Sequence, residues 1–123
     1  MDKNSEAMPV PTISLAGREW PLPKLAPRQN RIVVPALVTL VPKILRARDE
    51  ANAAGDKTAL AALPRYLDTE SYDALANVVF AALTRATPSL TRDEFDDMAA
   101  DTFELLAAVA PIARAAGLLK PAP

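Results

Sequence analysis

The chain has 123 residues, which fits a single domain, and half of them are apolar, including 25 alanines that favour helices. Its 14 basic and 15 acidic residues nearly cancel, and the absence of cysteine and scarcity of glycine exclude most disulfide-stapled and loop-rich folds. The start, Met1–Val10, holds no apolar signal core, and no uncharged run is longer than Ile32–Pro42, which is far shorter than the ~20 residues that span a bilayer. We therefore expect a soluble, cytoplasmic protein that does not enter a membrane.

The first predicted element is a β-hairpin, which follows a disordered polar tail at residues 1–11. Alternating apolar residues in Thr12–Leu15 and Glu19–Leu22 flank a glycine-containing turn at Ala16–Arg18. Pro21 has no N–H, so the second strand must lie at an edge or end early. Because an isolated hairpin is marginal in water, its apolar side chains should pack against helices. These side chains are Ile13, Leu15, Trp20 and Leu22.

The segment Arg28–Arg48 is predicted to be helical, with Pro27 in its first turn. At about 100° per residue, one side collects the apolar residues Val33, Val34, Leu37, Val38, Leu40, Val41, Ile44 and Leu45. The other side collects Arg28, Arg31, Lys43 and Arg46. Pro35 and Pro42 each remove a backbone hydrogen bond and clash with the preceding turn. We therefore expect a break before Pro35 and a kink near Pro42.

Two further helices are predicted in the middle of the chain. Gly55 is a plausible left-handed cap that ends the preceding helix, and Lys57–Leu63 fits a short helix. Asp68 or Thr69 can cap the next helix, roughly Glu70–Ala86. Its predicted inward stripe is Tyr72, Leu75, Val79, Leu83 and Ala86.

The last predicted element is one long helix that begins at a capping box, Thr91–Glu94. Its predicted inward stripe is Phe95, Met98, Thr102, Leu105, Leu106 and Val109, and Pro111 ends or kinks it. Residues 117–123 are a second disordered tail. The fold class is therefore mainly α, with a short N-terminal β-hairpin followed by a small bundle of about four helices. Residues 12–116 form the single helical domain.

The residues most often used for catalysis near neutral pH are missing. The chain has no histidine and no cysteine, and its three glycines stand too far apart for a phosphate-binding loop. Carboxylates gather at Asp93, Glu94, Asp96, Asp97, Asp101 and Glu104. A solvated helix start explains them better than a metal site, because calcium-loop spacing is absent. We expect no enzyme activity, no cofactor and no metal.

Aromatic and basic residues are the remaining candidates for contact with a partner. We favour the core for Phe80 and Trp20, and leave Phe103 open between core and partner. The arginines of Arg28–Arg48 could contact phosphates, but the chain is slightly acidic and has no basic surface interleaved with aromatics. We therefore favour a solvated or protein-facing surface over nucleic acid.

Three stretches resemble small phage tail assembly chaperones. Ile13–Leu22 resembles the opening hairpin of that family, and Pro27–Pro35 resembles its connector bearing proline and arginine. Leu83–Phe95 resembles its junction of helix end, proline and capped helix. As a pattern, the resemblance extends over roughly residues 12–110.

The resemblance implies a non-enzymatic assembly factor in the host cytoplasm. Such chaperones bind the helical tape-measure protein during tail construction, shield its apolar stripes and help recruit tail-tube proteins. Apolar residues of the first helix could line a groove for that partner, although we assign most of them to the core. The candidate partner-binding residues are Trp20, Arg28, Arg31, Leu37, Val41, Arg46 and Phe103. A structural phage neck or tail-completion subunit and a small DNA-binding regulator are the alternatives, and homo-oligomerisation stays open.

Overall fold

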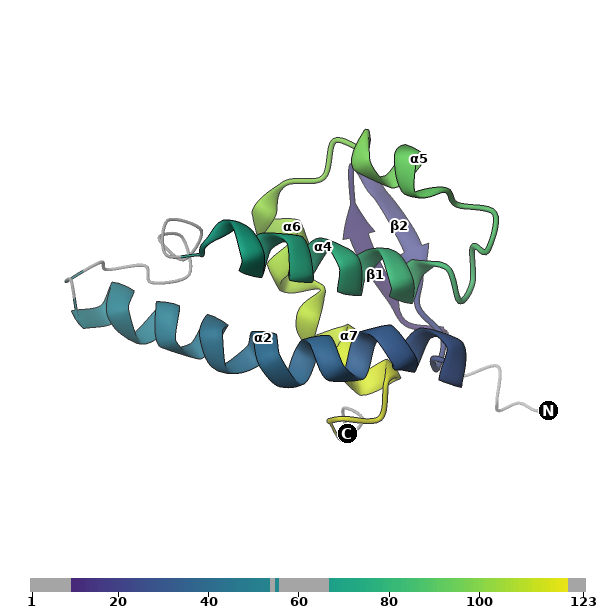
Figure 1. The fold of residues 1–123 in the computed structure, drawn as a ribbon. Coiled ribbons are helices and arrows are strands. Elements are labelled where there is room, and N and C mark those ends of the chain that lie inside the picture. Colours follow the sequence, from purple (N-terminus) through teal and green to yellow (C-terminus); the bar gives the residue numbers. More distant parts are fainter. Residues whose placement is uncertain (1–9, 54, 56–66, 120–123) are drawn as a thin grey trace.

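The computed structural model describes residues 10–53, 55 and 67–119, and it begins with the predicted hairpin (Figure 1). Strands β1 (Thr12–Leu15) and β2 (Arg18–Pro21) pair antiparallel, with Leu15 opposite Arg18. Both turn residues, Ala16 and Gly17, have positive φ angles of 55° and 74°. A two-residue turn of this kind matches the twist of the strands it joins. Arg18, which was predicted in the turn, is therefore the first residue of β2.

The hairpin packs against the helices as predicted. Its four inward side chains are buried, and Leu15 and Leu22 are almost completely so. Beyond β2, the backbone N–H of Leu25 donates to the carbonyl of Ala115 at 2.9 Å. This bond links the segment after the hairpin to the last helix, so the two ends of the described chain stabilise each other.

Helix α2 (Pro27–Ala53) is continuous, and the predicted break before Pro35 is wrong (Figure 1). Neither Pro35 nor Pro42 interrupts it, and both are exposed. By helix geometry, each proline deprives the carbonyl four residues earlier of its donor, here Arg31 and Val38. Both of these residues are also exposed, so water can hydrogen-bond to the carbonyls. Packing of the opposite side against α4 then outweighs the remaining cost of the prolines.

Helix α4 (Thr69–Leu83) lies alongside α2 (Figure 1). Its predicted cap is confirmed, because the Asp68 carboxylate accepts a hydrogen bond from the Ser71 N–H at 2.7 Å. The helix is buried on several sides, since α6 and α7 also contact it. Its buried residues are Ser71, Leu75, Ala76, Val78, Val79, Ala81, Ala82 and Leu83. The predicted stripe is therefore correct in its middle, whereas Tyr72 and Ala86 are exposed.

The predicted long last helix is wrong, because the chain forms α5 (Arg92–Asp96), α6 (Thr102–Ala107) and α7 (Val109–Ala115) instead. The predicted capping box of Thr91 and Glu94 is present at α5. A second box, in which Asp101 accepts from the Glu104 N–H at 2.8 Å, starts α6 and competes with a continuous helix. Pro111 lies in the first turn of α7 and has no N–H to donate to the Ala107 carbonyl, and α6 ends at Ala107. The predicted effect of Pro111 is therefore seen as the one-residue turn between α6 and α7.

One hydrophobic core joins the hairpin to α2, α4, α5, α6 and α7. Gly55 has the predicted left-handed conformation, with φ of 82°, just after α2. The helix predicted at Lys57–Leu63 lies outside the described residues. Within the described ranges, no helix combines the length and apolarity needed to cross a membrane.

Candidate protein-binding surface

The carboxylates flagged in the sequence serve the helix ends. The pKa of Glu94 is lowered because the backbone N–H and the hydroxyl of Thr91 donate to its carboxylate. Asp96 pairs with Arg92 at 2.9 Å, and Asp101 caps α6. Among the described residues, no three His, Cys, Asp or Glu side chains gather as metal ligands would. The acidic residues thus stabilise the starts of α5 and α6, and those described do not gather as the ligands of one metal ion would.

Helix α2 carries an exposed apolar row, which we call the outer face of α2; it starts at Ile32, beside the contact with α4, and continues on the side that faces away from α4. It consists of Ile32, Pro35, Val38, Pro42 and Leu45. Ile32 is 51% exposed, Val38 64% and Leu45 44%. The residues follow one another at intervals of three or four, so they form a single stripe about 20 Å long. Isolated exposed apolar residues are ordinary, but a continuous row typically marks a binding surface.

Helix α2 is therefore apolar on two opposite sides. Its inner side, which includes Val33, Leu37 and Leu40, is buried against α4 and the rest of the core. An apolar side of a helix is normally covered by another element. Among the described residues only the inner side of α2 is covered, so α2 carries more apolar side chains than this part of the fold buries.

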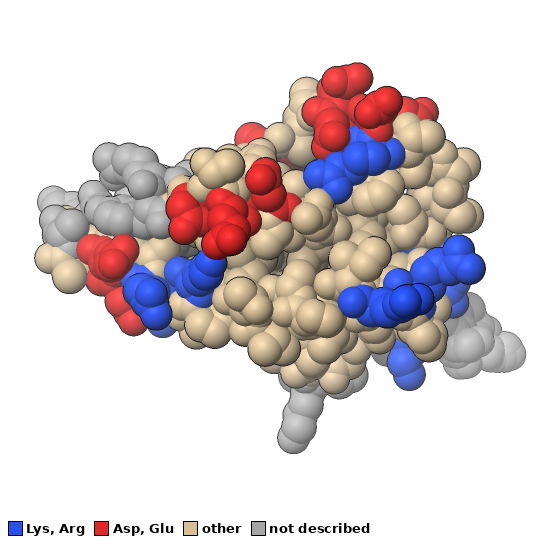
Figure 2. All heavy atoms as spheres, in the orientation of Figure 1, with Lys and Arg blue, Asp and Glu red and all other residues tan. Residues whose placement is uncertain are grey.

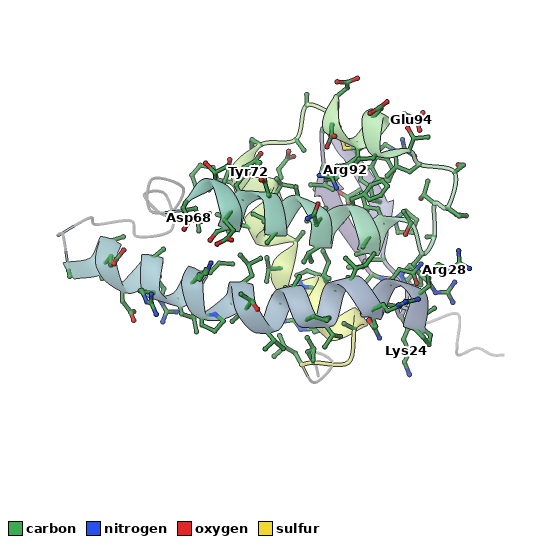
Figure 3. All side chains as sticks on the ribbon, viewed as in Figure 1. Lys24, Arg28, Asp68, Tyr72, Arg92 and Glu94 are labelled. Carbon is green, nitrogen blue, oxygen red and sulfur yellow. The ribbon has the colours of Figure 1, made fainter. Side chains whose placement is uncertain are left out.

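A groove between α2 and α4 continues the outer face, with Ile32 belonging to both. It has a volume of about 480 Å³, and its apolar lining includes Phe80. Arg28 of α2 and Arg92, the first residue of α5, lie among its lining residues (Figure 3). The Arg92 guanidinium donates to Asn77 Oδ1 at 2.7 Å and lies 5.6 Å from the Phe80 ring centroid. The lining of the groove thus combines apolar side chains, including Phe80, with the positively charged side chains of Arg28 and Arg92.

Basic side chains gather at the end of the molecule where α2 begins (Figure 2). Lys24 and Arg28 lie there (Figure 3), and the Arg85 guanidinium donates to the Lys24 carbonyl at 3.1 Å. Arg31, one turn further along α2 than Arg28, is also exposed. The outer face of α2 therefore begins beside a positive surface, and exposed Arg46 lies close to its other end.

The predicted partner-binding residues do not form one surface. Arg28, Arg31 and Arg46 are exposed on α2, whereas Val41 is half-buried against the core. Leu37 is only 1% exposed and is part of the core. A partner cannot reach it without rearrangement of the fold.

Two aromatic candidates have different surroundings. Trp20 is 4% exposed, so the core assignment is confirmed and a surface site cannot include it. Its indole N–H donates to the Leu15 carbonyl at 3.2 Å, and the Arg18 guanidinium lies 3.9 Å from the ring centroid. Phe103 is 44% exposed, but it lies on α6 beside β1, away from the outer face of α2.

Sequence reasoning missed the residues that make the outer face. It grouped Val38 and Leu45 on the apolar side of the first helix, most of which it assigned to the core, whereas both are exposed. The available signal was the width of the apolar sector, which exceeds what one neighbouring helix covers. No known protein family, curated protein or solved structure matches this chain, so the surface rests on its own geometry.

Proposed function

We propose that this chain is a non-enzymatic assembly factor that binds a helical segment of another protein along the outer face of α2. The observation that carries the proposal is the second apolar side of α2, formed by Ile32, Pro35, Val38, Pro42 and Leu45. Docking of a helix against this row would remove from water the apolar surface that the fold leaves exposed.

The spacing of the row supports a helical partner. An amphipathic helix with its own apolar residues at intervals of three and four can pack along it, ridges into grooves. The row is about 20 Å long, which corresponds to about four turns of a partner helix. Arg28, Arg31 and Arg46 near the ends of the row favour acidic residues beside the partner's stripe.

The resemblance to phage tail assembly chaperones supplies the identity of the proposed partner. A tape-measure protein is a long helix with apolar stripes, and it needs shielding in the host cytoplasm until the tail is built. One helix face supports a modest interface, which suits reversible binding better than a permanent joint. Recruitment of tail-tube proteins would follow once the tape-measure protein is held.

The test is co-purification of the tagged chain from cells that express its neighbouring genes, followed by analysis of purified particles. Recovery of the tape-measure protein, with the chain absent from particles, is the expected result. Stable presence in particles would favour a structural neck or tail-completion subunit instead. Recovery of no tail protein in either experiment would contradict the proposal.

The basic side chains at the start of α2 favour a second candidate, a small DNA-binding regulator (Figure 2). Contacts between arginines and phosphates would make binding strongly salt-dependent. This function requires DNA binding at low salt that is lost when both Arg31 and Arg46 are replaced by glutamate. We prefer the protein partner because the surface between these arginines is apolar.

A further inference from the structure

The outer edge of β1 has backbone groups available for another strand. In a hairpin with a two-residue turn, Leu15–Arg18 and Ile13–Trp20 are the hydrogen-bonded pairs of the register. The N–H and C=O groups of Thr12 and Ser14 therefore point away from β2. Within the described part of the chain, these four groups have no backbone partner. They present the hydrogen-bonding pattern of an unpaired sheet edge.

The two edges of the hairpin differ. On β2, the outward positions are Glu19 and Pro21, and Pro21 has no N–H to offer. Charged Arg18 and Glu19 also lie on that strand. Proline and charged residues on an edge strand commonly prevent another strand from pairing with it. The β1 strand, Thr-Ile-Ser-Leu, contains no proline and no charged residue, so of the two edges of the hairpin only the β1 edge is suited to strand addition.

A hollow of about 440 Å³ lies beside this edge, between β1 and α6. Thr12, Ser14 and the half-exposed Phe103 are among its lining residues, together with Asp101 and Glu104. The Glu104 carboxylate accepts hydrogen bonds from the Ala16 N–H at 3.3 Å and from the Asp101 N–H at 3.0 Å. The bond from Ala16 holds the Glu104 carboxylate next to the end of β1, and the Asp101 carboxylate accepts a hydrogen bond from the Glu104 N–H at 2.8 Å.

We propose that β1 accepts an extended, basic segment of a partner protein as a third strand. The backbone of that segment pairs with Thr12 and Ser14, an apolar side chain covers Phe103, and a Lys or Arg side chain meets Asp101 and Glu104. A second copy of this chain does not fit, because its β1 has no basic residue and its carboxylates would repel those of the first copy. This site is separate from the outer face of α2 and does not depend on the function proposed for it.

The test uses a capped peptide of alternating lysine and valine, about seven residues long, which matches a typical strand. We expect it to bind the full chain and to shift the amide resonances of Thr12 and Ser14 in NMR titrations. Ser14→Pro removes an N–H that makes no intrachain backbone bond, so the hairpin should persist while peptide affinity falls tenfold or more. Ser14→Val, which also loses the serine hydroxyl but keeps the N–H, is the matched control and should bind as the wild type does.

Two further comparisons separate strand addition from other forms of binding. A peptide with glutamate in place of lysine should bind at least tenfold more weakly, and Phe103→Ala should weaken the lysine peptide several-fold. Equal binding by Ser14→Pro and Ser14→Val would overturn the proposal. So would an absence of binding up to about 1 mM peptide, or dimers of the chain alone that Ser14→Pro dissociates.

Discussion

At the scale of single residues, three short polar side chains fix where helices begin. Asp68 starts α4, Thr91 starts α5 and Asp101 starts α6, each by accepting a hydrogen bond from a backbone N–H. The short helices α5 and α6 depend most on these bonds, because helices of this length are unstable on their own. Phe95 of α5 adds a buried contact, with its ring centroid 5.5 Å from that of Phe80.

Replacement of the α5 cap tests this account. Thr91→Ala should lower the free energy of unfolding by about 1 kcal/mol, because the Glu94 N–H loses its acceptor. Urea unfolding followed by circular dichroism measures this change. Thr91→Ser keeps the hydroxyl and should stay close to the wild type. An unchanged midpoint in Thr91→Ala would show that the cap does not hold α5.

Acid should weaken the fold through three carboxylates whose pKa values are lowered by hydrogen bonds. Ser14 and Thr12 donate to Glu19, Ser71 to Asp68, and Thr91 to Glu94. A carboxyl group whose pKa is lower in the folded protein than in the unfolded chain stabilises the fold at pH values above its ordinary pKa. That ordinary pKa is 4.5 for Glu and 3.8 for Asp. That stability is lost as the pH falls through the lowered folded values.

Urea midpoints measured from neutral pH into this acid range should therefore decrease. The urea midpoint of the Glu94→Gln variant should fall less steeply with decreasing pH than that of the wild type, because the variant has no carboxylate at this position. Identical pH dependence in the two proteins would contradict the role of Glu94.

At the scale of elements, features that depend on residues adjacent in the sequence were predicted correctly more often than features that depend on contacts between distant elements. The hairpin, the Asp68 cap and the Thr91 capping box depend on neighbouring residues, and all three are present. The continuity of α2 was not predictable from its own residues, because the cost of Pro35 and Pro42 is offset by packing against α4. The exposure of the outer face likewise depends on which side α4 covers. The apolar pattern of α2 alone does not show which of its sides α4 covers.

The prolines of α2 give a prediction at this scale. Pro35→Ala should raise the free energy of unfolding by about 1–2 kcal/mol, since alanine restores an intrahelical bond and has a higher helix propensity. Pro27→Ala is the matched control, because Pro27 is the first residue of α2 and removes no intrahelical bond. Thermal unfolding of both variants measures the difference. A destabilised Pro35→Ala would mean that the proline ring itself is needed for the fold.

At the scale of the whole molecule, the hairpin and the helices share one core, so they should unfold together. Trp20 is the single tryptophan of the chain and lies buried in β2, which makes its fluorescence a probe of the hairpin. Far-ultraviolet circular dichroism reports on the helices. The two signals should give the same urea midpoint, and Leu22→Ala should lower both by the same amount. Separate midpoints would show that the hairpin is an independent unit.

The central claim is that the outer face of α2 binds a helical partner. Its most direct test is the affinity of Val38→Asp for the tape-measure protein, measured by calorimetry beside the wild type. Val38 is 64% exposed, so the substitution should leave the fold intact and weaken binding tenfold or more, about 1.4 kcal/mol. Tyr72→Asp, at an exposed residue of α4, should bind as the wild type does. Equal affinities for Val38→Asp, Tyr72→Asp and the wild type would contradict the claim.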